Sequence, residues 1–168
     1  MMTTEEAIKT AIDYETRIRD IYAEAAESAV DPVGRRVFRT LRNDEQGHLD
    51  YLLDRLEQWQ KTGQITVEKL ETTIPAKNAI IRGLDKLERR MSITDRGDEK
   101  QMLSKALKVE TETSEFYRKM VDELSDIAQK MFARFLEIEE CHIAAVQAEL
   151  DYVSNTGYWF DFKEFDME

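Results

Sequence analysis

The chain has 168 residues, a formal net charge of −11 and a single cysteine. This length is typical of one domain with its own hydrophobic core, and the acidic excess argues against nucleic acids and anionic membranes as partners. One cysteine excludes an internal disulfide, which suits a reducing cytoplasm, and neither a membrane-spanning apolar run nor a signal peptide is expected from the sequence.

The first half of the chain predicts two long helices. Thr3 followed by Glu6 has the spacing of a capping box, in which each residue hydrogen-bonds the backbone of the other at a helix start. Asp31 and Pro32 predict the cap and opening residue of the second helix, which should end by Gly63 because glycine favours the left-handed turn that ends helices.

A crossover of about residues 62–97 is predicted between the second and third long helices. Pro75 interrupts it, and a short amphipathic stretch follows. The third long helix should begin near Asp98, and a loop around Ser125 and Asp126 should separate it from the fourth. The apolar positions of the amphipathic stretch are Ile80, Leu84, Leu87 and Met91.

Residues 156–168 form an aromatic and acidic tail after the bundle domain predicted for residues 1–155. Leaving so many aromatic rings exposed would be costly, so we expect the tail either to fold back over the bundle or to form a subunit interface. Its aromatic residues are Tyr158, Trp159, Phe160, Phe162 and Phe165.

Apolar residues recur in steps of three and four along all four long helices, which is typical of amphipathic helices that bury one face. In each helix the predicted buried face also contains glutamate, and in two it contains histidine. Buried charges of one sign cost several kcal/mol each unless a cation offsets them. The predicted inward positions are Ile8, Ala11, Glu15, Ile18, Tyr22, Ala25; Val37, Leu41, Glu45, His48, Leu52, Leu56, Trp59; Leu103, Ala106, Glu110, Ser114, Tyr117, Leu124; and Phe132, Phe135, Glu139, His142, Val146, Leu150, Val153.

Both histidines of the chain follow a glutamate by three residues, as Glu45 with His48 and as Glu139 with His142. Positions i and i+3 of a helix share a face, so each pair can direct a carboxylate and an imidazole to one point. Two such pairs, with one glutamate from each of two other helices, are the ligands of a carboxylate-bridged dinuclear metal site in a helical bundle.

The two further glutamates are supplied by a repeat. Glu15 precedes Tyr22 by seven residues, Glu110 precedes Tyr117 by seven, and the two Glu–Tyr pairs are 95 residues apart. The Glu-x-x-His pairs are 94 residues apart, so the chain is a duplicated helical hairpin. Packing alone could explain the inward tyrosines, but their hydroxyls could also hydrogen-bond ligand carboxylates.

Two divalent cations would balance the charge of four glutamates, which favours two metal ions over one. Carboxylate and imidazole ligands without thiolates suit iron, with manganese as the alternative. No catalytic residue separate from the metal site is predicted.

The order Glu-x6-Tyr and Glu-x-x-His, occurring twice, resembles the di-iron domain of rubrerythrins in the ferritin-like superfamily, over roughly residues 5 to 155. The resemblance implies an all-α four-helix bundle with a long crossover, in which Glu45 and Glu139 bridge the metals. It also implies that reduced di-iron reacts with hydrogen peroxide or dioxygen. The metal ligands it implies are Glu15, Glu45, His48, Glu110, Glu139 and His142.

Two departures from the family pattern affect the expected activity. Rubrerythrins carry an extra glutamate, which takes part in peroxidase chemistry, where this chain has Thr113. The lone Cys141 cannot form the rubredoxin-like iron centre of complete rubrerythrins, which needs two Cys-x-x-Cys motifs. Electrons would therefore come from a separate protein, such as a rubredoxin.

Three functions remain open at this point: an oxidoreductase that reduces peroxide or dioxygen with an external electron donor, a ferroxidase that stores or buffers iron, and an interaction module with a structural metal site. A homodimer is expected, and exchange of hairpins between subunits is an option because a long crossover makes it easy.

Overall fold

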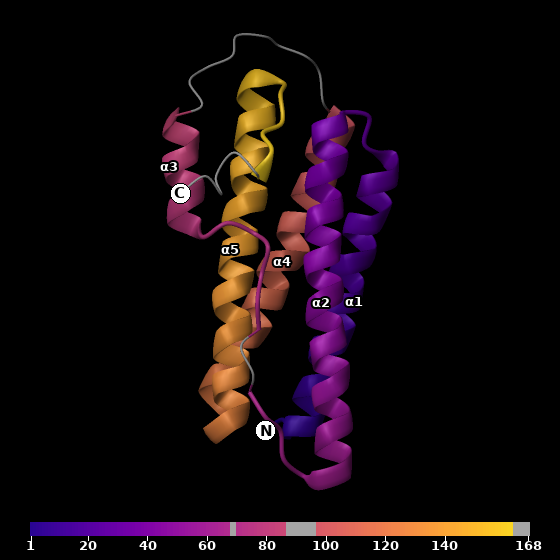
Figure 1. Ribbon diagram of the computed structural model, residues 1–168, viewed down its shortest axis with the longest axis vertical. Coiled ribbons are helices and arrows are strands. Elements are labelled where there is room, and N and C mark those ends of the chain that lie inside the picture. Colours follow the sequence, from indigo (N-terminus) through magenta and orange to yellow (C-terminus); the bar gives the residue numbers. More distant parts are fainter. Residues whose placement is uncertain (68–69, 87–96, 163–168) are drawn as a thin grey trace.

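The computed structural model describes residues 1–67, 70–86 and 97–162, and the helices of this part form an elongated bundle (Figure 1). Helices α1 and α2 pack as one antiparallel hairpin, α4 and α5 as a second, and α1 contacts α4 between the hairpins. The predicted all-α, ferritin-like bundle is confirmed, and the described residues contain no strand. The helices are α1 (Thr4–Ser28), α2 (Pro32–Thr62), α3 (Lys77–Lys86), α4 (Gly97–Glu123) and α5 (Asp126–Thr156).

Local capping signals determine where the first two helices begin and end. The Thr3 hydroxyl accepts a hydrogen bond from the backbone of Glu6, whose carboxylate accepts one from the Thr3 backbone N–H at 2.8 Å. The Asp31 carboxylate accepts hydrogen bonds from two backbone N–H groups in the first turn of α2. Gly63 ends this helix with a φ of 69°, in the left-handed region that glycine adopts without strain.

The crossover runs back along the bundle between α2 and α5 and leads into α3, which packs on α5 (Figure 1). Leu70 and Ile74 are buried along this path, and so is Ile80 at the start of the predicted amphipathic stretch. The other predicted positions of that stretch, Leu84, Leu87 and Met91, lie outside the side chains that the structure describes.

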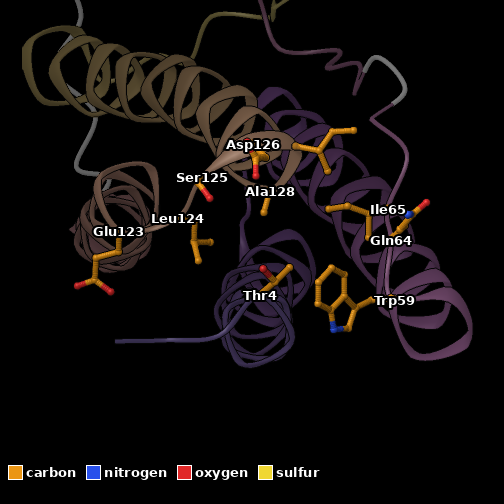
Figure 2. Close-up of a pocket in the computed structure, with 11 residues that line it drawn as sticks. Thr4, Trp59, Gln64, Ile65, Glu123, Leu124, Ser125, Asp126 and Ala128 are labelled. Atoms are coloured by element: carbon orange, nitrogen blue, oxygen red, sulfur yellow. The ribbon is translucent and has the colours of Figure 1, made fainter.

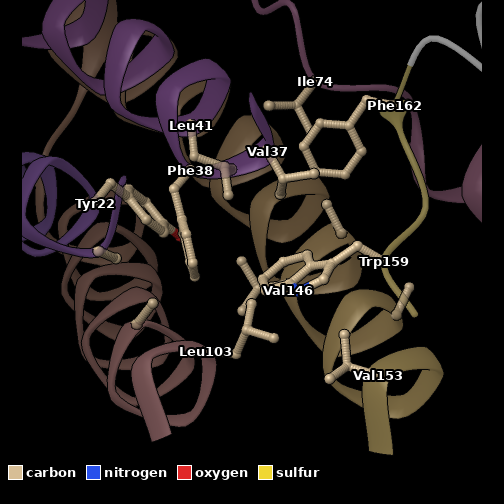
Figure 3. Close-up of a cluster of buried hydrophobic side chains, with 14 of the residues drawn as sticks. Tyr22, Val37, Phe38, Leu41, Ile74, Leu103, Val146, Val153, Trp159 and Phe162 are labelled. Atoms are coloured by element: carbon tan, nitrogen blue, oxygen red, sulfur yellow. The ribbon is translucent and has the colours of Figure 1, made fainter. Parts of the chain in front are cut away.

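The predicted inward faces form two hydrophobic clusters, one toward each end of the bundle. Figure 3 shows the cluster that includes Tyr22, Phe38 and Trp159. Most predicted inward residues are buried, and a few are half-buried at the edge of the two clusters. These half-buried residues are Leu56, Trp59, Leu124 and Leu150.

The described part of the aromatic tail packs on the bundle. The rings of Trp159, Phe160 and Phe162 are buried, and Trp159 meets Phe38 edge-on with 5.1 Å between ring centroids (Figure 3). The indole N–H of Trp159 donates a 3.0 Å hydrogen bond to the buried carboxylate of Glu99 on α4. Phe165 lies outside the described residues, and a subunit interface for the tail stays a prediction.

In the part of the chain that the structure describes, no helix combines the length and the apolar character needed to cross a membrane.

Candidate metal centre

The six predicted ligands meet inside the bundle. Glu15 comes from α1 and Glu110 from α4, whereas α2 and α5 each contribute one Glu-x-x-His pair. The helical period places each on the inward face, where neighbouring turns are apolar. The six residues have no exposed surface, and they are Glu15, Glu45, His48, Glu110, Glu139 and His142.

These residues form two overlapping groups that share Glu45 and Glu139. Glu15 and His48 complete one group, Glu110 and His142 complete the other, and the candidate ligand atoms within each group lie within 4.8 Å of one another. The imidazole Nδ1 of His142 is 2.6 Å from Glu45 Oε1, and that of His48 is 3.3 Å from Glu45 Oε2. Each group therefore offers one imidazole, one glutamate of its own and two shared glutamates to a metal ion.

Several carboxylate oxygens in this cluster are buried without a hydrogen-bond donor. Neither oxygen of Glu45 and neither oxygen of Glu139 has a hydrogen-bond donor. His142 Nδ1 lies 2.6 Å from Glu45 Oε1, but this contact does not have the geometry of a hydrogen bond. One oxygen each of Glu15 and Glu110 is also without a donor. Buried polar atoms are almost always satisfied in folded proteins, so this concentration of unsatisfied oxygens fits metal coordination.

Burial and close neighbours raise the pKa of some of these glutamates and lower the pKa of others. Burial, and then the negative charges of neighbouring glutamates, hold the pKa of Glu45 and of Glu139 well above the usual value. Burial would also raise the pKa of Glu15, but its close contacts with Glu45 and His48 and the hydrogen bond from Tyr117 outweigh that effect and lower the pKa to about 2. Without cations the centre thus retains protons on some ligands, as expected of groups that exchange protons for metal.

The pKa values of both histidines are also shifted, by two effects that oppose each other. Burial would lower the pKa of His48 and of His142, but the surrounding carboxylates raise both well above the usual value. The two imidazoles lie nearly parallel, with 5.3 Å between ring centroids. Their Nδ1 atoms face the glutamates, which leaves both Nε2 atoms facing away from them toward Asp44.

Two tyrosines hydrogen-bond across the hairpins to the glutamates that the two metal groups do not share. The Tyr22 hydroxyl donates to Glu110 Oε1 at 2.6 Å, and the Tyr117 hydroxyl donates to Glu15 Oε1 at 2.5 Å. Burial, and then the facing carboxylates, hold the pKa of both tyrosines well above the usual value, so both hydroxyls stay protonated donors. The sequence left open whether these tyrosines only pack in the core or also hydrogen-bond glutamates, and in the structure they do both.

Sequence reasoning missed Asp44, the residue that faces both histidines from outside the glutamate cluster. Asp44 Oδ2 lies 2.6 Å from His142 Nε2 and 3.4 Å from His48 Nε2. Burial opposes its ionisation, but the hydrogen bond with His142 and the charges of both histidines hold the pKa of Asp44 well below its usual value. Its position one turn before His48 was the available signal, since residues i and i+4 share a helix face.

Thr113, at the position of the extra family glutamate, supplies no carboxylate to the cluster. It is buried, and its hydroxyl donates a 2.7 Å hydrogen bond to the backbone carbonyl of Val109. Glu112 beside it is turned to the surface, where it contacts Arg17 at 3.4 Å. The described residues thus bring four glutamates to the metal centre from the predicted positions.

A separate surface pocket of about 490 Å³ lies at the end of the bundle where α1 and α5 begin and α2 ends (Figure 2). Trp59, Ile65 and Leu124 line it together with polar residues of the α4–α5 loop. None of the six predicted ligands lines this pocket, so it is distinct from the metal centre.

A helical bundle that encloses a cluster of four glutamates and two histidines defines the class of carboxylate-bridged metalloproteins with a ferritin-like fold. The sequence matches the family model of rubrerythrin across residues 6–150, and the chain therefore belongs to the rubrerythrin family. Among curated proteins and solved structures, no match was found.

Proposed function

We propose that this protein is a non-haem di-iron oxidoreductase that reduces hydrogen peroxide or dioxygen with electrons from an external donor. One observation carries the proposal: four fully buried glutamates and two fully buried histidines converge, and six of the carboxylate oxygens have no hydrogen-bond donor. Four carboxylates need four positive charges, which two divalent ions provide. Membership of the rubrerythrin family supports iron over manganese.

The chain's own residues would hold the metals in two similar positions. We infer that Glu15 and His48 bind one ion, that Glu110 and His142 bind the other, and that the shared glutamates bridge them. Two bound iron ions would supply one electron each to the oxidant. The absence of exposed surface on all six residues would exclude bulk water from this reaction.

Tyr22 and Tyr117 would hold the terminal glutamates in place during this reaction. Their hydroxyls donate to Glu110 and Glu15, so each tyrosine fixes a carboxylate from the opposite hairpin. A fixed terminal carboxylate leaves the shared pair, whose oxygens have no donors, as the more adaptable ligands.

Electrons for repeated turnover would come from a separate protein. A single cysteine cannot hold a rubredoxin-like centre, so a rubredoxin in the cytoplasm is the expected donor. A homodimer remains the expected assembly, with or without exchange of hairpins.

Iron oxidation for storage or buffering is the second candidate. Thr113 supports it, because the hydroxyl of this buried residue is engaged by the helix backbone and no carboxylate occupies the position linked to peroxidase chemistry. Size-exclusion mass separates the candidates, since iron storage of the ferritin kind needs a large shell whereas the oxidoreductase needs only a small oligomer.

The first test is elemental analysis of untagged protein prepared without chelators, combined with an anaerobic Fe(II) titration. About two irons per chain, followed by reoxidation with added peroxide, is the expected result. Peroxide consumption with a rubredoxin and its reductase then tests the full activity. No tight metal binding, or binding unchanged in Glu45→Ala and His142→Ala, would overturn the proposal.

A further inference from the structure

Asp44 is buried, with 6 % of its surface exposed, and its two carboxylate oxygens have different neighbours. Oδ2 faces the metal centre, where it lies 2.6 Å from His142 Nε2 and 3.4 Å from His48 Nε2. Oδ1 faces the crossover, where it accepts a 2.8 Å hydrogen bond from the backbone N–H of Thr73. The carboxylate thus lies between both histidines and a segment that belongs to neither hairpin.

A third metal ion between Asp44 and the histidines is the less favourable explanation of this contact. A neutral imidazole has one nitrogen with a free lone pair, and its other nitrogen carries a proton. If Nδ1 of each ring binds metal on the glutamate side, Nε2 is the protonated nitrogen and can only donate. Asp44 Oδ2 then accepts a hydrogen bond from His142 Nε2–H at 2.6 Å, and it also faces His48 Nε2 at 3.4 Å, a nitrogen that has no hydrogen-bond partner among the described residues.

The crossover holds the Asp44 carboxylate in this position. The Thr72 hydroxyl donates a 2.6 Å hydrogen bond to Oδ2, the same oxygen that faces the histidines. The Thr73 hydroxyl lies 3.3 Å from Oδ1 and adds a second contact to that of its backbone. Leu70 and Ile74, on either side of the threonines, are buried and anchor this segment on the bundle.

The repeat supplies no second copy of this carboxylate. Asp44 precedes Glu45 directly, and the residue that precedes Glu139 in the other hairpin is Ile138, which is buried in the hydrophobic cluster. One aspartate therefore serves a site that is otherwise built twice, so its loss should affect both histidines.

We propose that Asp44 is a positioning residue shared by both histidines, and that Thr72 and Thr73 of the crossover hold it in the orientation that directs both Nδ1 atoms at the metals. This inference rests on the proposed metal centre. Carboxylates that orient a metal-binding histidine typically affect metal affinity about 10- to 100-fold when they are removed.

The test uses full-length protein loaded with Co(II), in which proton NMR detects the exchangeable Nε2–H protons of histidines that bind the metal through Nδ1. The wild type should take up two Co(II) ions and show two such signals that exchange slowly with solvent. In Asp44→Ala both signals should be lost to exchange, and the affinity for both ions should fall about 10- to 100-fold.

Further variants separate positioning from folding. Thr72→Val removes the hydroxyl that donates to Oδ2 and accepts from the backbone N–H of Ile74, so it should speed exchange of both signals, whereas Thr72→Ser keeps the hydroxyl and should show the wild-type rate. Asp44→Asn keeps an acceptor oxygen and should give an affinity between those of the wild type and Asp44→Ala, and it decides the question if the alanine variant does not fold. Asp50→Asn and Thr66→Val, at exposed positions of α2 and the crossover, are matched controls that should leave both signals unchanged.

Each contrary outcome has a distinct meaning. Unchanged signals and affinity in Asp44→Ala would overturn the positioning role while leaving the metal centre intact. Loss of one signal alone would show that Asp44 serves a single histidine and would overturn the shared role. Failure of the wild type to bind Co(II) would instead refute the proposed metal centre, and this inference with it, before any variant is compared.

Discussion

Glu45 and Glu139 are fully buried and lie close to other glutamates. If both were ionised, each would be repelled by the neighbouring negative charges. The raised pKa of each relieves this repulsion in the metal-free protein, because a protonated carboxyl carries no charge. His48 and His142 also retain protons above their usual range. At the residue scale, protons and metal ions are therefore alternative occupants of the same ligands.

This competition predicts that metal affinity rises with pH. Glu45, Glu139 and both histidines have raised pKa values, so they bind protons at a pH where ordinary side chains of their type have lost them. Metal binding must release these protons, and raising the pH from about 5.5 to 8 should tighten Mn(II) or Fe(II) binding. Anaerobic calorimetry in buffers of different ionisation enthalpy would measure both affinity and proton release. Affinity independent of pH would contradict the prediction.

The tyrosine hydrogen bonds predict a loss of stability on removal of one hydroxyl. Tyr22→Phe or Tyr117→Phe removes a short hydrogen bond to a buried carboxylate oxygen, so the free energy of unfolding of the metal-free protein should fall by about 1–3 kcal/mol. Urea unfolding in the presence of a chelator measures this change. Tyr14→Phe is the matched control, because this half-buried ring keeps its stacking on Phe116, and the change should stay within about 0.5 kcal/mol.

At the scale of secondary-structure elements, the tail packs closely against α2 at a single glycine, Gly34. A Cβ atom at Gly34 would lie 2.7 Å from Cε2 of Trp159, closer than packed atoms allow. Trp159 is held in place by Phe38 on one side and by its hydrogen bond to Glu99. The absence of a side chain at Gly34 therefore lets the tail pack on the start of α2.

A pair of glycine substitutions tests this contact. Gly34→Ala should destabilise the protein by about 1–3 kcal/mol, because the indole must move from a well-packed position. Gly47→Ala, in the exposed interior of the same helix with no atom within 4 Å of the added Cβ, should instead stabilise by about 0.5–1 kcal/mol. Urea unfolding measures both changes. Equal effects of the two substitutions would mean that the tail does not pack on Gly34 in solution.

At the scale of the whole molecule, the metal centre is where the two hairpins meet. α1 and α2 supply half of the ligand set and α4 and α5 the other half, and each candidate metal group contains residues of both hairpins. Each tyrosine likewise reaches a glutamate on the opposite hairpin. Metal binding should therefore stabilise the assembled bundle rather than either hairpin alone.

This link predicts that bound metal raises the free energy of unfolding of the entire bundle. At a free Mn(II) or anaerobic Fe(II) concentration of about 100 times the dissociation constant, the gain for one site should be about 2.7 kcal/mol, because the unfolded chain lacks the assembled centre. Thermal unfolding followed by circular dichroism, with metal and with chelator, measures the difference. In Glu45→Ala, which lacks a shared ligand, the difference should largely disappear; an unchanged difference would place the stabilising metal elsewhere.

The sequence alone determined the features that depend on local helical period. The three-residue spacing of Glu45 and His48 sets their common face whatever surrounds the helix, and the same holds for Glu139 and His142. The cap at Asp31 acts within one turn in the same way. These features could be predicted because they depend on neighbours in the chain, and the duplicated pattern then indicated the family.

Only the tertiary structure decided which distant segments meet at the centre. Asp44 has no counterpart in the repeat, so its contact with His142 depends on how α2 is placed relative to α5, and its orientation depends on where the crossover places Thr72. The fit of Trp159 at Gly34 likewise joins residues far apart in the chain. Helical period specifies which way a side chain faces on its own helix, but its partner across the bundle depends on the relative position of helices, which the packing of the whole core sets.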